Sequence, residues 1–102
     1  MARYSVPRDP FDQFLGSVAA DLDFGIADDA TIVEHWCKPL SERELRAFLG
    51  SLDDRIRMRE LPWQQIIKDS NRHFRTCDDV RAWLVRIRSL VAVQITDRGQ
   101  KE

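Results

Sequence analysis

Two short segments contain the side chains best suited to chemistry, with His35 and Cys37 in the first and His73 and Cys77 in the second. Two thiolates and two imidazoles make a complete tetrahedral ligand set for zinc. Structural zinc sites usually bring a close pair of cysteines and a close pair of histidines, whereas each segment here mixes the two types. We therefore expect no metal and no cofactor, and we expect both cysteines to be free thiols.

Catalytic motifs are the next possibility. A nucleophilic Cys/His pair needs both side chains within hydrogen-bond reach and a third group that orients the base, and the sequence brings no such set together. It also lacks a GxSxG segment, a phosphate-binding glycine loop and an HExxH segment. The acid pairs Asp28-Asp29 and Asp78-Asp79 lie where predicted helices begin, and the helix dipole explains them. The sequence therefore predicts a protein that is not an enzyme and has no small-molecule substrate.

Charge is distributed unevenly along the 102 residues, although the net charge is only −1. Residues 1–37 contain seven acidic and two basic side chains, whereas residues 38–102 contain ten acidic and 14 basic ones. A local cluster of carboxylates repels itself unless a positively charged partner offsets the field. A solubilising surface is the alternative interpretation. The candidate partner-binding residues are Asp21, Asp23, Asp28, Asp29 and Glu34.

Basic residues crowd the later half, and helices there could form a unit that resembles a helix-turn-helix. The sequence pI is about 6.1, and Asp and Glu lie among the basic residues. DNA-binding domains are usually clearly basic, so we favour a solvated charged surface over nucleic-acid binding. The basic residues are Arg55, Arg57, Arg59, Lys68, Arg72, Arg75, Arg81, Arg86 and Arg88.

The elements that must position these residues are predicted to be helices, because apolar residues recur at helical spacing between sparse Gly and Pro. Asp9 is a candidate N-cap before Pro10. Ser41 with Glu44, and Thr76 with Asp79, have the form of capping boxes. The predicted helices are Pro10 to Ala20, Asp29 to Cys37, Glu42 to Arg57, a short helix after Pro62, and Cys77 to Ala92.

These elements predict an all-α fold, a compact bundle of about five helices. Residues 1–95 would form one domain, and residues 96–102 a frayed polar tail. The apolar runs are too short for a membrane span, and no export leader is evident. We therefore expect a cytoplasmic protein with no membrane partner.

The order of several segments resembles the small helical immunity proteins of bacterial contact-dependent growth inhibition systems, over roughly residues 11–91. The segments are Phe11-Asp12-Gln13-Phe14-Leu15-Gly16, Asp21-Leu22-Asp23, Ile32-Val33, the Leu45 to Leu52 helix, and Trp83-Leu84. The resemblance implies a cytoplasmic protein that binds the toxic C-terminal domain of a cognate effector and blocks its active site. Such toxin domains are often nucleases, whose grooves are basic because they hold phosphate, so the acidic segment would bind by mimicking that charge.

Two other interpretations stay open on sequence grounds. One is a small helical nucleic-acid-binding regulator, and the other is a phage-derived interaction module. Genomic neighbourhood separates them, since an immunity protein is expected directly downstream of a large secreted effector.

Overall fold

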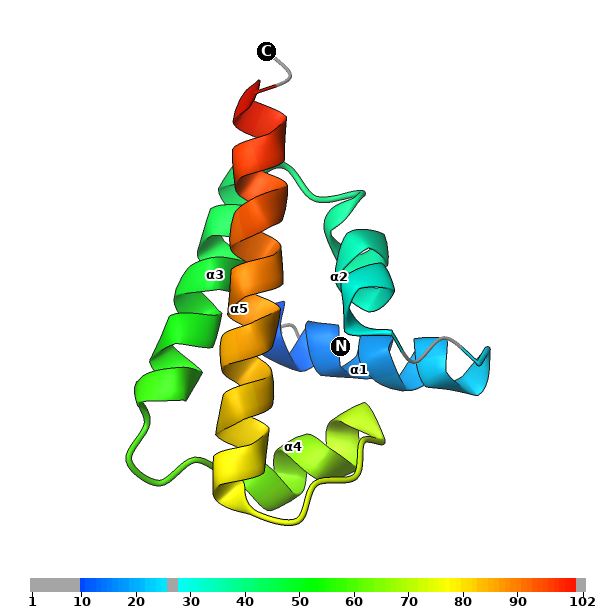
Figure 1. The fold of residues 1–102 in the computed structure, drawn as a ribbon, viewed down its shortest axis with the longest axis vertical. Coiled ribbons are helices and arrows are strands. Elements are labelled where there is room, and N and C mark those ends of the chain that lie inside the picture. The colour runs from blue at the N-terminus through cyan, green and yellow to red at the C-terminus, as the bar shows by residue number, and fades with distance from the viewer. Residues whose placement is uncertain (1–9, 26–27, 101–102) are drawn as a thin grey trace, which may run out of the picture.

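The computed structural model describes the backbone of residues 10–25 and 28–100, and every regular element in these ranges is an α-helix (Figure 1). This confirms the predicted all-helical fold with five helices. The bounds of α2 and α3 agree with those predicted from the sequence. The helices are α1 (Pro10–Asp23), α2 (Asp29–Cys37), α3 (Glu42–Arg57), α4 (Trp63–Ser70) and α5 (Cys77–Gln100).

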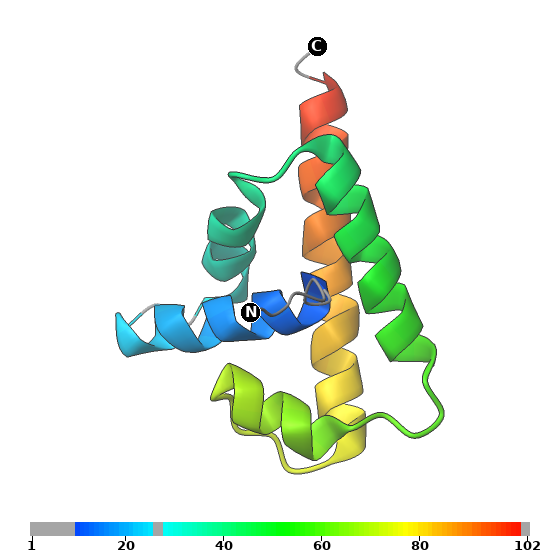
Figure 2. The ribbon, with the colours of Figure 1, turned by 180° about the vertical axis from the view of Figure 1, so that it is seen from behind.

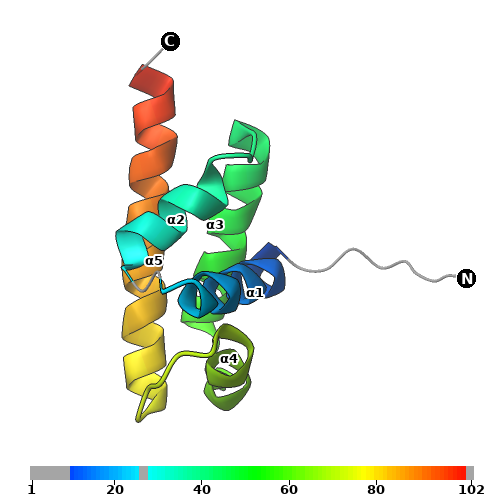
Figure 3. The ribbon, with the colours of Figure 1, turned by 90° about the vertical axis from the view of Figure 1, so that its right-hand side faces the viewer.

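The longest helix, α5, forms one side of the molecule and packs extensively against three of the other helices. It packs most extensively along α3, and it also packs against α2 and α4. Helix α1 crosses the bundle and packs against α2, α3 and α4. Its C-terminal end projects beyond the other helices, as the front and back views agree (Figures 1 and 2). The view along α1 shows α2 and α4 on either side of it (Figure 3).

An aromatic cluster joins four helices at the centre of the core. The ring centroid of Phe14 on α1 lies 5.8 Å from Trp36 on α2, 5.1 Å from Phe48 on α3 and 6.2 Å from Trp83 on α5. Aromatic pairs at these separations stabilise a core beyond the area that they bury. Phe14 is fully buried. Phe14 therefore packs at the centre of the core, where it joins α1 to α2, α3 and α5.

Helix starts follow the predicted capping chemistry where the structure describes them. Ser41 Oγ accepts the Glu44 N–H at 3.1 Å, and Glu44 Oε1 accepts the Ser41 N–H at 2.9 Å, so the capping box is confirmed. The Ser41 backbone N–H that the carboxylate accepts, together with the Ser41 side chain, holds the pKa of Glu44 below its usual value. At α5, Thr76 Oγ1 accepts the Asp79 N–H at 3.1 Å. The predicted cap Asp9 lies outside the described residues.

The C-terminal end of α5 differs from the frayed tail that the sequence suggested. The helix continues through Gln100. Arg98 explains the difference, because its Nη2 donates to the Cys37 carbonyl at 2.6 Å and its Nη1 donates to the Leu40 carbonyl. The last carbonyls of a helix have no partner within the helix, so an arginine from a neighbouring helix can satisfy them. The polar residues after Ile95 thus extend α5 and fasten it to the end of α2.

Replacing Arg98 with alanine should lower the free energy of unfolding by about 2 kcal/mol, because hydrogen bonds to a charged group contribute more than neutral ones. Urea unfolding followed by circular dichroism measures the change. Arg43→Ala, at an exposed position on α3, is the control and should change stability by less than about 0.5 kcal/mol. If Arg98→Ala and Arg43→Ala have equal effects, the end of α5 does not fasten α2.

Candidate functional site

The five candidate acids divide into exposed and inward-facing residues. Asp23, Asp28 and Glu34 are exposed, whereas the Asp21 and Asp29 side chains retain 17% and 14% of their accessible area. Asp21 and Asp23 belong to the last turn of α1, and Asp28 and Asp29 lie at the start of α2. We call Asp21, Asp23 and Asp28 the junction acids, since they lie where α1 ends and α2 begins. The structure therefore brings part of the predicted set to one place.

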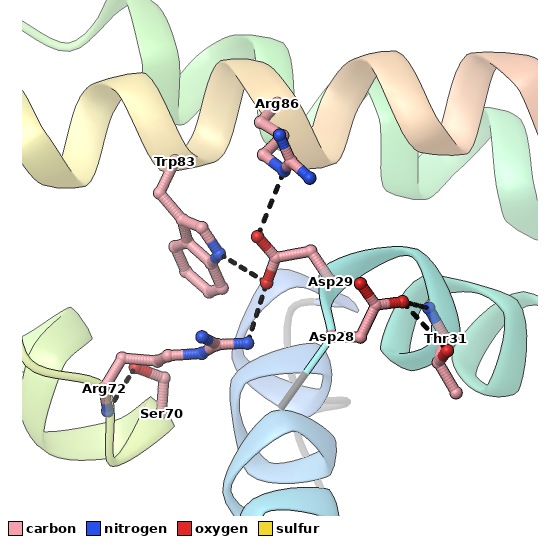
Figure 4. A network of polar contacts seen from close by, with 7 residues as sticks. All are labelled: Asp28, Asp29, Thr31, Ser70, Arg72, Trp83 and Arg86. Carbon is pink, nitrogen blue, oxygen red and sulfur yellow. Dashed lines mark hydrogen bonds and ion pairs between the residues drawn. The ribbon is translucent and has the colours of Figure 1, made fainter. Parts of the chain in front are cut away.

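Asp29 is the centre of an internal polar network (Figure 4). Its Oδ1 accepts from Arg72 Nη2 at 2.7 Å and from Trp83 Nε1 at 3.1 Å, and its Oδ2 lies 3.2 Å from Arg86 Nε. The Arg72 side chain is 19% exposed, so this pair is largely shielded from water. Asp29 thus ties the start of α2 to α5 and to the segment before it. Its carboxylate is committed to these contacts, so we do not count it as part of a binding surface.

Asp28 begins α2 as its N-cap. Its Oδ2 accepts the backbone N–H of Thr31 at 3.0 Å and the Thr31 hydroxyl at 2.9 Å (Figure 4). These two bonds lower the pKa of Asp28 from its usual value, because they stabilise the charged carboxylate. Because the side chain is exposed, its negative charge still faces solvent. Asp28 can therefore cap the helix and present a charge to a partner.

Asp21 lies between the end of α1 and the middle of α2. Its Oδ2 is buried, has no hydrogen-bond partner and lies 3.7 Å from His35 Nδ1. The His35 side chain is 48% exposed. A protonated His35 would form an ion pair with this carboxylate. Asp21 contributes negative charge beneath the surface that Asp23 and Asp28 form.

Glu34 lies in different surroundings, at a polar cleft of about 540 Å³ between the C-terminal ends of α2 and α5. The cleft contains acidic and basic side chains in equal number besides a histidine. Glu34 is therefore part of a mixed-charge cleft and does not enlarge the acidic surface at the junction. The cleft is lined by Glu34, His35, Lys38, Gln94, Asp97 and Arg98.

Most of the basic residues of the later half have internal partners. Arg81 donates to the Met58 carbonyl at 2.9 Å and to the Ile56 carbonyl, which closes the end of α3. Arg88 forms an ion pair with Asp53 of α3. Six of the nine basic residues make such contacts: Arg55, Arg57, Arg72, Arg81, Arg86 and Arg88. Apart from Arg57, whose exposed partner Asp54 lies on the same helix, these arginines join different segments of the fold, a role that no local pattern indicated.

The histidines and cysteines do not form a cluster. Cys37 is buried, Cys77 is half-buried, both are free thiols, and His35 and His73 are exposed. Burial raises the pKa of the Cys37 thiol to about 11. Among the described residues, no three His, Cys, Asp or Glu side chains are grouped so that they could hold a metal ion.

Sequence reasoning missed Phe24, which follows directly after the last residue of α1 and is 85% exposed. It lies next to Asp23 at the projecting end of that helix. The available signal was that Phe24 falls outside the apolar stripe of α1 and precedes a glycine that ends the helix. An aromatic side chain beside carboxylates completes the description of this surface.

No protein family model matches the sequence, and neither the characterised proteins nor the solved structures with which it was compared give a match. None of the described helices is long and apolar enough to cross a membrane. The fold and surface define a small all-helical protein with an acidic, aromatic-bearing junction between α1 and α2.

Proposed function

We propose that this protein is an immunity-type inhibitor that binds the toxic C-terminal domain of a cognate contact-dependent inhibition effector and blocks its active site. The observation that supports the proposal best is the separation of charge in the fold. Asp23 faces solvent in the last turn of α1 and Asp28 faces solvent at the start of α2, while Arg72 and Arg88 of the later half are paired with Asp29 and Asp53. The junction therefore presents the acidic side chains of Asp23 and Asp28, with the exposed Arg86 as their basic neighbour.

A negative junction suits a basic partner surface such as the groove of a nuclease. Complementary fields steer the two proteins together and raise the association rate, most strongly at low salt. Two hydrogen bonds from Thr31 lower the pKa of Asp28, which favours its charged form. Asp21 adds to the same field from below. The carboxylates of the inhibitor would occupy the groove in place of nucleic-acid phosphates, and the inhibitor would catalyse no reaction.

The nucleic-acid-binding alternative has less support in this fold. A phosphate-binding surface needs several cations that are free to contact the backbone of DNA or RNA. Here Arg72 and Arg86 are held on Asp29, and Arg88 is held on Asp53. These carboxylates offset part of the positive charge that a phosphate backbone would need.

Charge removal at the junction tests the proposal. The variant combines Asp23→Lys with Asp28→Asn, because asparagine keeps the N-cap and removes only its charge. The probe is the purified toxin domain of the effector encoded directly upstream. We expect affinity for this domain to fall by about tenfold or more, with a weaker dependence on salt, since the lost charges are near the partner. Isothermal calorimetry at two salt concentrations measures both.

A matched control makes the same change of charge elsewhere. Glu60→Lys with Asp69→Asn alters exposed residues on or next to α4 and should leave the affinity within about twofold of the original, because these charges lie outside the proposed binding surface. If both variants bind equally well, the junction acids only solubilise the protein. If the unaltered protein binds no neighbouring toxin domain and binds DNA in a salt-sensitive manner, the regulator interpretation replaces this one.

A further inference from the structure

Phe24 is the most exposed large hydrophobic side chain among the described residues. It is 85% exposed, compared with 53% for Val93, 46% for Val85 and 37% for Met58. Removing an aromatic side chain from water is strongly favourable, so one that stays exposed contributes little to its own fold. Burial of this ring against another molecule would stabilise a complex by the free energy of removing the ring from water, which folding alone does not provide.

Two hydrogen bonds hold the backbone that carries Phe24. The Phe24 N–H donates to the Asp21 carbonyl and the Gly25 N–H donates to the Leu22 carbonyl, both at 3.0 Å. Gly25 has a φ of 83°, which glycine adopts without strain and which ends the helix. Leu22 packs against the core. The ring is therefore displayed from a hydrogen-bonded turn, which limits the conformational entropy lost on binding.

The charges beside the ring restrict what can cover it. Asp23 is adjacent and exposed, and Asp28 is exposed at the start of α2. A second copy docked through the same end would bring these carboxylates against their equivalents, which is unfavourable. An anionic membrane surface would repel them as well. An apolar pocket with lysine or arginine at its rim matches both the ring and the acids.

We propose that Phe24 is the aromatic anchor of the interface, inserted into an apolar pocket of a partner protein whose rim carries basic side chains that pair with Asp23 and Asp28. This inference rests on the proposed function and specifies the chemistry of the partner at the same surface. Interfaces concentrate their binding energy in a few desolvated anchors, among which aromatic residues are enriched, while the charged rim sets rate and specificity. On this protein's side of the interface, Phe24 supplies the anchor and the acids supply the charged residues around it.

The first experiment compares Phe24→Ala with Val93→Ala in the full chain, with the purified upstream toxin domain as the probe. Phe24→Ala should weaken binding by at least about thirtyfold, the scale of an interface hot spot, while its salt dependence persists because the acids are retained. Val93→Ala, which shortens an exposed side chain on α5, should leave affinity within about twofold. Equal affinities of Phe24→Ala and the unaltered protein overturn the inference, as does a large fall in melting temperature caused by Phe24→Ala alone.

The second experiment separates this inference from the proposed function. The photo-crosslinker p-benzoylphenylalanine replaces Phe24, and in a control chain Val93, in cells of the native host. The inference expects a cross-link that is specific to position 24, lies beside Lys or Arg in the captured protein, and identifies a protein whose purified form binds Phe24→Ala weakly. If that protein is not a toxin domain, the proposed function fails and the anchor stands. If position 24 captures nothing beyond the control, the anchor is wrong.

Discussion

Replacing Asp29 with alanine is expected to lower the free energy of unfolding by about 3 kcal/mol, because breaking a largely buried ion pair leaves the partner charge uncompensated. Arg72 is 19% exposed and would lose its carboxylate, and Trp83 Nε1 would lose its acceptor. Arg86, whose side chain is 64% exposed, would be solvated by water, so the loss of its pair with Asp29 should lower stability only slightly. Urea unfolding monitored by circular dichroism measures the effect.

A matched exposed pair provides the control for Asp29. Asp54 and Arg57 form an ion pair on α3 with side-chain exposures of 70% and 74%. Asp54→Ala should therefore change stability by less than about 1 kcal/mol. Asp29→Asn keeps one acceptor oxygen, so its loss of stability should lie between the losses for Asp29→Ala and Asp54→Ala. A loss below about 1 kcal/mol for Asp29→Ala would mean that water replaces the carboxylate and that the network does not hold α2 in place.

Replacing Phe14 with alanine should have the largest effect on stability, a loss of about 4 kcal/mol, because large-to-small changes in a core remove buried area and leave a cavity. Phe14 contacts aromatic rings from three other helices, so no single neighbour can move in to fill the space. Thermal and urea unfolding of the same variant measure the loss.

Phe24→Ala is the natural control, since both phenylalanines lie on or directly after α1 and lose the same atoms. Phe14 is 0% exposed and Phe24 is 85% exposed, so Phe24→Ala should change stability by less than about 0.5 kcal/mol. Phe14→Leu should be milder than Phe14→Ala, because a leucine fills part of the cavity. Similar effects of Phe14→Ala and Phe24→Ala would contradict the central position of Phe14.

The elements that the sequence predicted best are those governed by neighbouring residues. The bounds of α2 and α3 depend on a cap, on Pro39 and on a periodic apolar face, all of which are local. The end of α5 was mistaken because it depends on Arg98, whose acceptor at Cys37 lies 61 residues away. A helix end that is stabilised by tertiary contacts leaves no periodic signal.

The candidate site could be predicted only in part for the same reason. Five acids that lie close in the sequence were expected to form one surface, yet Asp29 turns inward to meet Arg72 and Trp83, which lie 43 and 54 residues further along the chain. Sequence spacing shows that charges are near one another but not which of them finds an internal partner. Phe24 was missed because its position outside the apolar stripe of α1 indicates only that it does not pack in that helix's core face, while its exposure is a property of the fold.

The two arginines of α5 that bind carbonyls also bear on how the chain folds during synthesis. Arg81 meets Ile56 from 25 residues away, and Arg98 meets Cys37 from 61. Both acceptor ends therefore leave the ribosome before the side chains that satisfy them. Until α5 emerges, the ends of α2 and α3 depend on water and fray, so a nascent chain that stops before α5 should bind chaperones and be cut by proteases at these ends. Completion of the fold is thus coupled to translation of its last helix.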